Sequence, residues 1–197
     1  CPAGTLSQFE VSKYLNVFGL TMDDVTFVPM EYAQAYQAFK TGEGDILATR
    51  SPQTYTAIDD EGWVSAASMK DLKADATAQI VVSAEAYENK ADALSVLLSL
   101  VAKEGDKLNG DVEYAASLMS EWFRQNGQDI DLEVSKRQLS EKPFYGVEDV
   151  KTREFGDDFK NTLVEFYVES EQLEAELKDT VCNNVRNDIL VKAGLNE

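Results

Sequence analysis

Short β-rich runs alternate with helical stripes over the first 60 residues, and this alternation restricts the possible folds more than any other feature. Apolar residues recur at helical spacing over residues 6–18 and again over 32–39. Two runs typical of buried strands follow these stripes, Val25–Val28 and Asp45–Thr49. Short strands joined by helices favour parallel pairing, because parallel strands need a long crossover connection. The pattern therefore predicts a three-layer α/β lobe with a parallel-dominated sheet.

Helical stripes dominate the rest of the chain. One further strand is predicted at Ala78–Val82. The later stripes cover Leu94–Val101, Val112–Phe123, Leu132–Leu139, Phe155–Tyr167 and Val185–Leu190. We therefore expect an α/β part over residues 1–85, followed by a helix-rich C-terminal part over residues 86–197; the resemblance described below implies that the first part is a ligand-binding lobe.

Composition excludes several classes of function. The 197 residues carry a formal net charge of −18, which repels phosphate backbones, so we expect no nucleic-acid partner. The chain has no histidine, so neither a Ser-His-Asp nor a Cys-His mechanism can be assembled. Two cysteines, Cys1 and Cys182, are not spaced as a zinc-ligand pair, and we predict no metal and no cofactor.

Three motifs occur in order in the first third of the chain. Pro2–Ser7 is a Gly-Thr-x-Ser turn that opens a helix, and Gly19–Val25 passes from a Gly-Leu pair through Asp-Val into a strand. In Ala38–Ile46, an alanine followed by a hydrophobic residue is succeeded by glycine and then by aspartate, at which another predicted strand begins. In this order they resemble the start of the second lobe in the periplasmic solute-binding proteins of ABC importers for sulfonates, nitrate, taurine and thiamine-precursor pyrimidines.

The resemblance continues along the later part of the chain. Ala78–Ala86 resembles the family's Gln-hydrophobic-Val-Val-Ser strand, and Val181–Ala193 resembles its C-terminal ending. Family members carry most of a first lobe ahead of this region, so we expect this sequence to be a fragment or a reduced homologue. The helical part would then pack toward the absent lobe, and the apolar face left exposed predicts dimerisation or lobe swapping.

The resemblance implies the type II periplasmic-binding-protein fold and an extracytoplasmic protein, periplasmic or anchored as a lipoprotein, whose signal segment lies outside this sequence. It implies that two lobes close over a small anionic or heteroaromatic nutrient, which is then delivered to an ABC permease. We therefore expect a binding protein and not an enzyme.

Two alternatives remain open. One is an enzyme on the same fold in pyrimidine or menaquinone-precursor synthesis, which would have to use carboxylates such as Asp45 and Glu31. The pyrimidine-synthesising branch is marked by a cysteine-rich motif, which two distant cysteines do not supply. The other alternative is a ligand-sensing module, for which the sequence shows no DNA-binding or signalling segment.

A ligand site is predicted where helices begin. The Gly4–Gln8 turn offers unpaired backbone N–H groups and two hydroxyls, which suit a sulfonate, phosphate or carboxylate, although the same residues also fit ordinary helix capping. Arg50 lies beyond a predicted strand end, where it would pair with the ligand's anionic group or remain a solvated surface arginine.

Further candidates surround these two. Glu31 follows a strand end but also fits the first turn of a helix, and Asp59–Glu61 lacks the spacing of a calcium loop. Tyr55 and Trp63 would form aromatic walls or belong to the core. The predicted ligand-binding residues are Gly4, Thr5, Leu6, Ser7, Gln8, Met30, Glu31, Thr49, Arg50, Ser51 and Tyr55.

Overall fold

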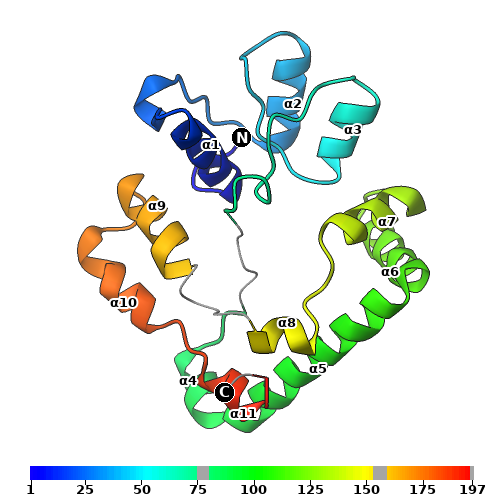
Figure 1. Ribbon diagram of the computed structural model, residues 1–197, viewed down its shortest axis with the longest axis vertical. Helices are drawn as coiled ribbons and strands as arrows, with labels where there is room; N and C mark the ends of the chain where they lie inside the picture. The colour runs from blue at the N-terminus through cyan, green and yellow to red at the C-terminus, as the bar shows by residue number, and fades with distance from the viewer. Residues whose placement is uncertain (75–79, 153–158, 196–197) are drawn as a thin grey trace. The chain divides into compact units, whose positions relative to one another are not determined.

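A computed structural model describes residues 1–74, 80–152 and 159–195. These residues form helices joined by turns and extended segments, and the described part of the chain contains no β-strand (Figure 1). The prediction of a three-layer α/β lobe with a parallel sheet is therefore wrong for the described residues. Part of the strand predicted at Ala78–Val82 lies outside them.

The runs predicted as strands are extended but unpaired. Within the described residues, the segment 26–30 makes one backbone hydrogen bond, from Met30 N–H to the carbonyl of Cys1 at 3.2 Å. Val28 and Ile46, which a sheet would bury, are 52% and 56% exposed. A strand needs a neighbour to satisfy its backbone donors and acceptors, and β-propensity alone does not supply one.

The helical stripes of the first third are confirmed. The predicted stripe at residues 6–18 forms α1 (Leu6–Val17), and the stripe at 32–39 forms α2 (Tyr32–Lys40). Gly19 ends α1 with φ +71°, and the N–H of Leu20 donates to the carbonyl of Leu15. This Schellman arrangement requires a left-handed residue, which glycine supplies at low cost.

The chain divides into two compact units. The first comprises Cys1–Thr77 and Asp157–Cys182, and the second comprises Ala78–Gly156 and Asn183–Glu197. The two expected domains, residues 1–85 and 86–197, stay a prediction.

The first unit joins the start of the chain to a later segment. Its remaining elements are η1 (Met22–Asp24), α3 (Gln53–Asp59), the π-helix η2 (Phe159–Val164), α9 (Glu165–Glu169), η3 (Ala175–Leu177) and α10 (Lys178–Asn183), which ends one residue beyond the unit. Phe9 on α1 is 1% exposed and packs against Phe166 on α9, with ring centroids 5.3 Å apart. Ala74 and Leu163 complete this cluster. The start of the predicted stripe Phe155–Tyr167 lies outside the described residues, and its later part forms η2 and α9.

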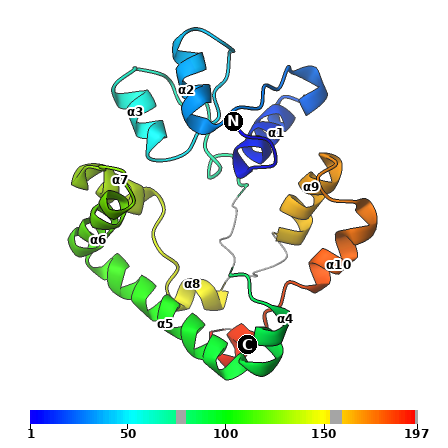
Figure 2. The same cartoon turned by 180° about the vertical axis from the view of Figure 1, so that it is seen from behind.

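The second unit is a set of helices. They are α4 (Ala84–Asn89), α5 (Ala91–Gly110), α6 (Val112–Gln125), α7 (Leu132–Glu141), α8 (Val147–Thr152) and α11 (Asp188–Lys192). Helices α6 and α7 lie side by side, as do α5 and α11 (Figures 1 and 2). Small residues fill the α6–α7 contact, where Ala116 is fully buried and the hydroxyls of Ser120 and Ser135 lie 2.9 Å apart.

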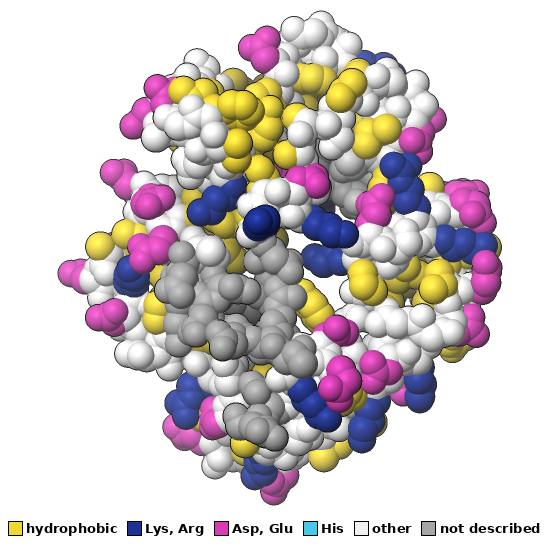
Figure 3. Space-filling view, viewed as in Figure 1, with side chains coloured by type: hydrophobic (Ala, Val, Ile, Leu, Met, Phe, Trp, Pro, Cys, Tyr) yellow, Lys and Arg dark blue, Asp and Glu magenta, His cyan; other side chains and the backbone are white. Residues whose placement is uncertain are grey.

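The surface carries both acidic and apolar side chains. Figure 3 shows acidic groups scattered over the visible face and hydrophobic side chains at the surface among them. None of the described helices combines the length and the apolar composition needed to cross a bilayer.

Candidate functional site

The turn that opens α1 is shaped around Gly4. Gly4 has φ +71°, and its N–H donates to Oε1 of Gln8 at 2.7 Å. A Cβ at this position would lie 2.5 Å from Oε1 of Gln172, whose Nε2 in turn lies 3.5 Å from Oε1 of Gln8. The backbone conformation therefore favours glycine here, and a larger residue would also have to displace the end of the Gln172 side chain.

The turn uses some of its own donors and leaves others available. Thr5 donates its hydroxyl to the carbonyl of Pro2 at 2.8 Å, so that group is already engaged. No described group accepts a hydrogen bond from the backbone N–H of Leu6 or Ser7. These N–H groups start a helix of 12 residues, where the partial positive charge of the helix dipole is concentrated. The turn therefore has two donors that no described acceptor uses.

Tyr32 links three elements around this turn. Its hydroxyl lies 3.0 Å from the hydroxyl of Ser7, which is 5% exposed. The guanidinium carbon of Arg50 lies 4.6 Å from the centroid of the Tyr32 ring, a cation–π arrangement. The structure thus connects Ser7 of the Gly4–Gln8 turn with Arg50 through one intermediate side chain. The strand that was predicted to precede Arg50 is absent from the described residues. The connecting residue was missed because Tyr32 was assigned to the apolar stripe of its helix.

Arg50 carries its positive charge next to the Tyr32 ring. It is exposed, and it forms no ion pair with any carboxylate of the described residues. In a chain with twice as many acidic as basic residues, a guanidinium that has no carboxylate partner among the described residues favours an anionic group.

The other predicted residues have more local roles. Thr49 donates its hydroxyl to Oε1 of Gln53 at 2.6 Å, and Glu31 is exposed at the N-cap of α2 without capping it through its side chain. Met30 is half-buried, and its backbone bonds to Cys1. Leu6 is exposed and Ser51 half-buried.

The two aromatic candidates lie in packed surroundings. Tyr55 is 4% exposed. Trp63 packs against the rings of Phe39 and Tyr36, with centroids 4.8 and 5.1 Å away, which assigns it to an aromatic cluster with α2. These contacts therefore favour the alternative in which Trp63 belongs to the core and does not form a wall of the ligand site.

One carboxyl on α1 lies in an unfavourable environment for charge. Burial raises the pKa of Glu10 above its ordinary value, and a hydrogen bond from the backbone of Met69 partly opposes this shift. No group of three or more potential metal-ligating side chains gathers within the described residues.

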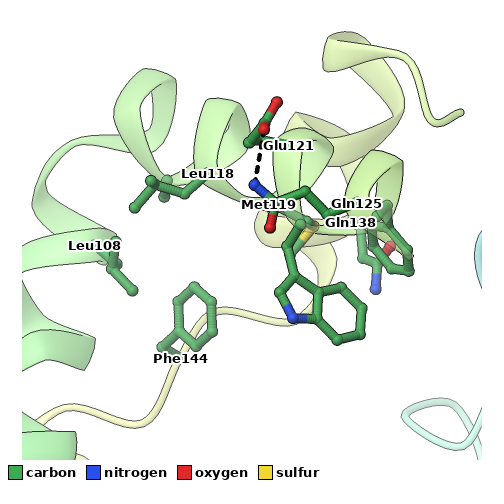
Figure 4. A pocket seen from close by; sticks show the side chains of 10 residues that line it. Leu108, Leu118, Met119, Glu121, Gln125, Gln138 and Phe144 are labelled. Carbon is green, nitrogen blue, oxygen red and sulfur yellow. Dashed lines mark hydrogen bonds between the residues drawn. The ribbon is translucent and has the colours of Figure 1, made fainter. Parts of the chain in front are cut away.

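The second unit contains a hollow that the sequence analysis did not predict. It has a volume of about 570 Å³ and is lined by α5, α6, α7 and the loop before α8 (Figure 4). Ala115, Met119 and Phe123 had been assigned to the apolar stripe of their helix, but Leu108, Trp122 and Phe144 had not. The open space between these residues depends on how the helices pack.

Comparison with known proteins gives one informative similarity. The chain is 29% identical over 192 residues to a protein of Brachyspira hyodysenteriae named "Putative ABC transporter periplasmic binding protein". The matched region covers 98% of this chain and 55% of that relative, so the chain spans little more than half of the relative's length. No family model matches the chain, and no solved structure does. The similarity supports the resemblance to the solute-binding proteins of ABC importers.

Proposed function

We propose that this chain belongs to the extracytoplasmic solute-binding component of an ABC importer and that its first unit holds an anionic group of the solute. The similarity to a named periplasmic binding protein over 98% of the chain supports the class of function. The N–H groups of Leu6 and Ser7 and the Arg50 guanidinium support the anionic group, because the described residues supply no acceptor for the first two and no carboxylate for the third. The single observation that carries the site is the link from Ser7 through Tyr32 to Arg50.

The finer assignment follows from the same residues. A small sulfonate, nitrate or carboxylate fits two backbone donors and one guanidinium, and a heteroaromatic portion of the solute would contact the Tyr32 ring. We also propose that the remaining residues of the predicted set surround the bound solute. They include Met30, Glu31, Thr49, Ser51 and Tyr55. Closure of a facing lobe over the solute would precede delivery to the permease.

A binding experiment tests the site directly. Isothermal titration calorimetry with taurine, methanesulfonate, nitrate and hydroxymethylpyrimidine would find the solute class. For an anionic solute that binds, Arg50→Gln should weaken affinity about ten- to a hundredfold, because a hydrogen bond to a charged group is lost. Ser7→Ala should have a smaller effect, since it removes only the link to Tyr32.

The matched control is Arg124→Gln. Arg124 is exposed in the second unit and is paired with Glu121 on its own helix, so its loss should leave affinity unchanged. Equal affinity of the Arg50→Gln and wild-type proteins, or no binding of any anionic solute, would contradict the proposed site.

We also propose that two copies associate, by dimerisation or lobe swapping, through the extended runs of the first unit. Val28, Ile46 and Val64 are exposed there by 52%, 56% and 92%. Unpaired backbone in such runs is a template for pairing with a second chain. Sedimentation velocity over a range of concentrations should show a dimer, and a monomer at all concentrations would contradict this part of the proposal.

A further inference from the structure

The hollow in the second unit is separate from the proposed anion site. Its volume of about 570 Å³ lies within the range of roughly 300–1,000 Å³ typical of small-molecule sites. Figure 4 shows Leu108, Leu118 and Phe144 on one side of it, and Gln125 and Gln138 on the other. All of these residues belong to one compact unit.

Aromatic and aliphatic side chains form most of its wall. Trp122 is 59% exposed and Phe144 is 39% exposed, although both rings border the hollow. Trp122 also packs edge-to-face on Phe123, at a centroid distance of 5.1 Å, which holds a large aromatic surface in place. A flat apolar ring would remove this surface from water.

One polar atom in the wall lacks a partner. Oε1 of Gln138 is buried, and no described group donates a hydrogen bond to it. Buried polar atoms are ordinarily hydrogen-bonded. Gln138 lines the hollow, so a rotation of its side chain would bring this unpaired oxygen to a ligand donor there.

The other polar groups of the wall are occupied. Gln125 donates to Glu121 at 2.8 Å, the bond drawn in Figure 4, and Glu121 also accepts from Arg124. No basic residue lines the hollow. An anion would therefore find no counter-charge in the wall, in contrast to the site around Arg50.

We propose that this hollow is a second small-molecule site, which binds a flat, uncharged aromatic heterocycle carrying an N–H group. The ring lies against Trp122 and Phe144, and its N–H donates to Oε1 of Gln138. The ligand class differs from that of the anion site, so each proposal can be contradicted without affecting the other.

Indole is the probe, because it is a flat ring system with a single N–H donor. Benzofuran is the matched control, since it has the same shape and no N–H. The full chain has two tryptophans, whose side-chain N–H signals can be followed by ¹⁵N–¹H NMR and assigned with Trp63→Phe. Indole should shift the Trp122 signal in a saturable way and leave the Trp63 signal unchanged. Benzofuran should bind about three- to tenfold more weakly, by the loss of one neutral hydrogen bond.

Two variants separate the contributions of polarity and shape. Gln138→Leu should abolish the preference for indole while benzofuran still binds. Leu118→Asp should block both probes, because it places a carboxylate in the apolar wall. Its control is Leu97→Asp, which alters a side chain of similar exposure on α5 that does not line the hollow, and it should leave binding unchanged. Circular dichroism would establish that each variant is folded.

Three results would overturn the proposal. The first is a Trp122 signal that indole at millimolar concentration does not move. The second is equal affinity of the wild-type protein for indole and benzofuran. The third is a Trp122 signal that shifts with protein concentration alone, which would show that a second copy covers the hollow. Taurine should not move this signal, and its binding to the first unit is measured independently.

Discussion

The two units bury different kinds of side chain. In the first unit, large residues from distant parts of the chain meet, as Phe9 and Phe166 do. In the second, Ala102, Ala115 and Ala116 occupy helix contacts, while Trp122 is 59% exposed. Small residues let the helices approach closely, and aliphatic side chains such as Leu139 and Leu195 are buried beside them, while the aromatic Trp122 is not. The comparison teaches that a stretch of alternating large and small residues can serve either a core or a binding surface, depending on which of them face the neighbouring helix.

Loss of a large core residue should have the greatest effect on the first unit. Phe9→Ala should lower the free energy of unfolding by about 3–5 kcal/mol, because it leaves a cavity between α1 and α9. Urea denaturation measures this change. Phe18 lies at the C-terminal end of the same helix and is 62% exposed. Phe18→Ala should therefore lower the free energy of unfolding by less than about 0.5 kcal/mol. Equal costs at the two sites would mean that Phe9 is not a core residue.

Added volume, in contrast, should have its greatest effect on the second unit. A Cβ on Gly105 would lie 2.3 Å from the backbone carbonyl oxygen of Tyr145, so Gly105→Ala should destabilise by about 1–3 kcal/mol. Gly110→Ala on the same helix meets nothing within 4 Å and should be neutral or stabilising by up to about 1 kcal/mol. Thermal denaturation of both variants tests the close packing, and a neutral Gly105→Ala would disprove it.

The turn around Gly4 provides an intermediate case within the first unit. Gly4→Ala combines a left-handed backbone with a clash against Gln172, and we expect a loss of about 1–2 kcal/mol. Gly44→Ala has φ +80° but open space around its Cβ, so it measures backbone strain alone. The difference between the two melting temperatures isolates the contact with Gln172. No difference would indicate that the Gln172 side chain moves aside freely.

A partly buried charge on α1 should produce the smallest effect. Burial raises the pKa of Glu10, so the ionised side chain destabilises the folded state. For a carboxyl with a raised pKa, this penalty is absent below its ordinary value and grows as pH rises through the folded-state pKa. Glu10→Gln should therefore raise the melting temperature slightly at pH 7, and the difference should vanish near pH 4. A pH-independent difference would assign the effect to packing instead of ionisation.

Part of the fold was predictable from local pattern. Apolar spacing placed α1 and α2, and Gly19 marked the end of α1, because a helix's periodicity and its left-handed terminal residue are local properties. Val25–Val28 and Asp45–Thr49 had strand-like composition and were wrongly placed in a sheet. Pairing is a property of two segments, and neither run contains its own partner.

The candidate site shows the same division. Sequence alone determined the glycine turn that opens α1, the acidic balance and the absence of histidine, because each of these is a matter of residue type and order. Only the tertiary structure decided that Tyr32 lies between Ser7 and Arg50, that Trp63 packs with α2, and that Gln138 ends unpaired in an apolar wall. Contacts between residues far apart in the chain depend on how whole helices pack, and no local pattern specifies that packing.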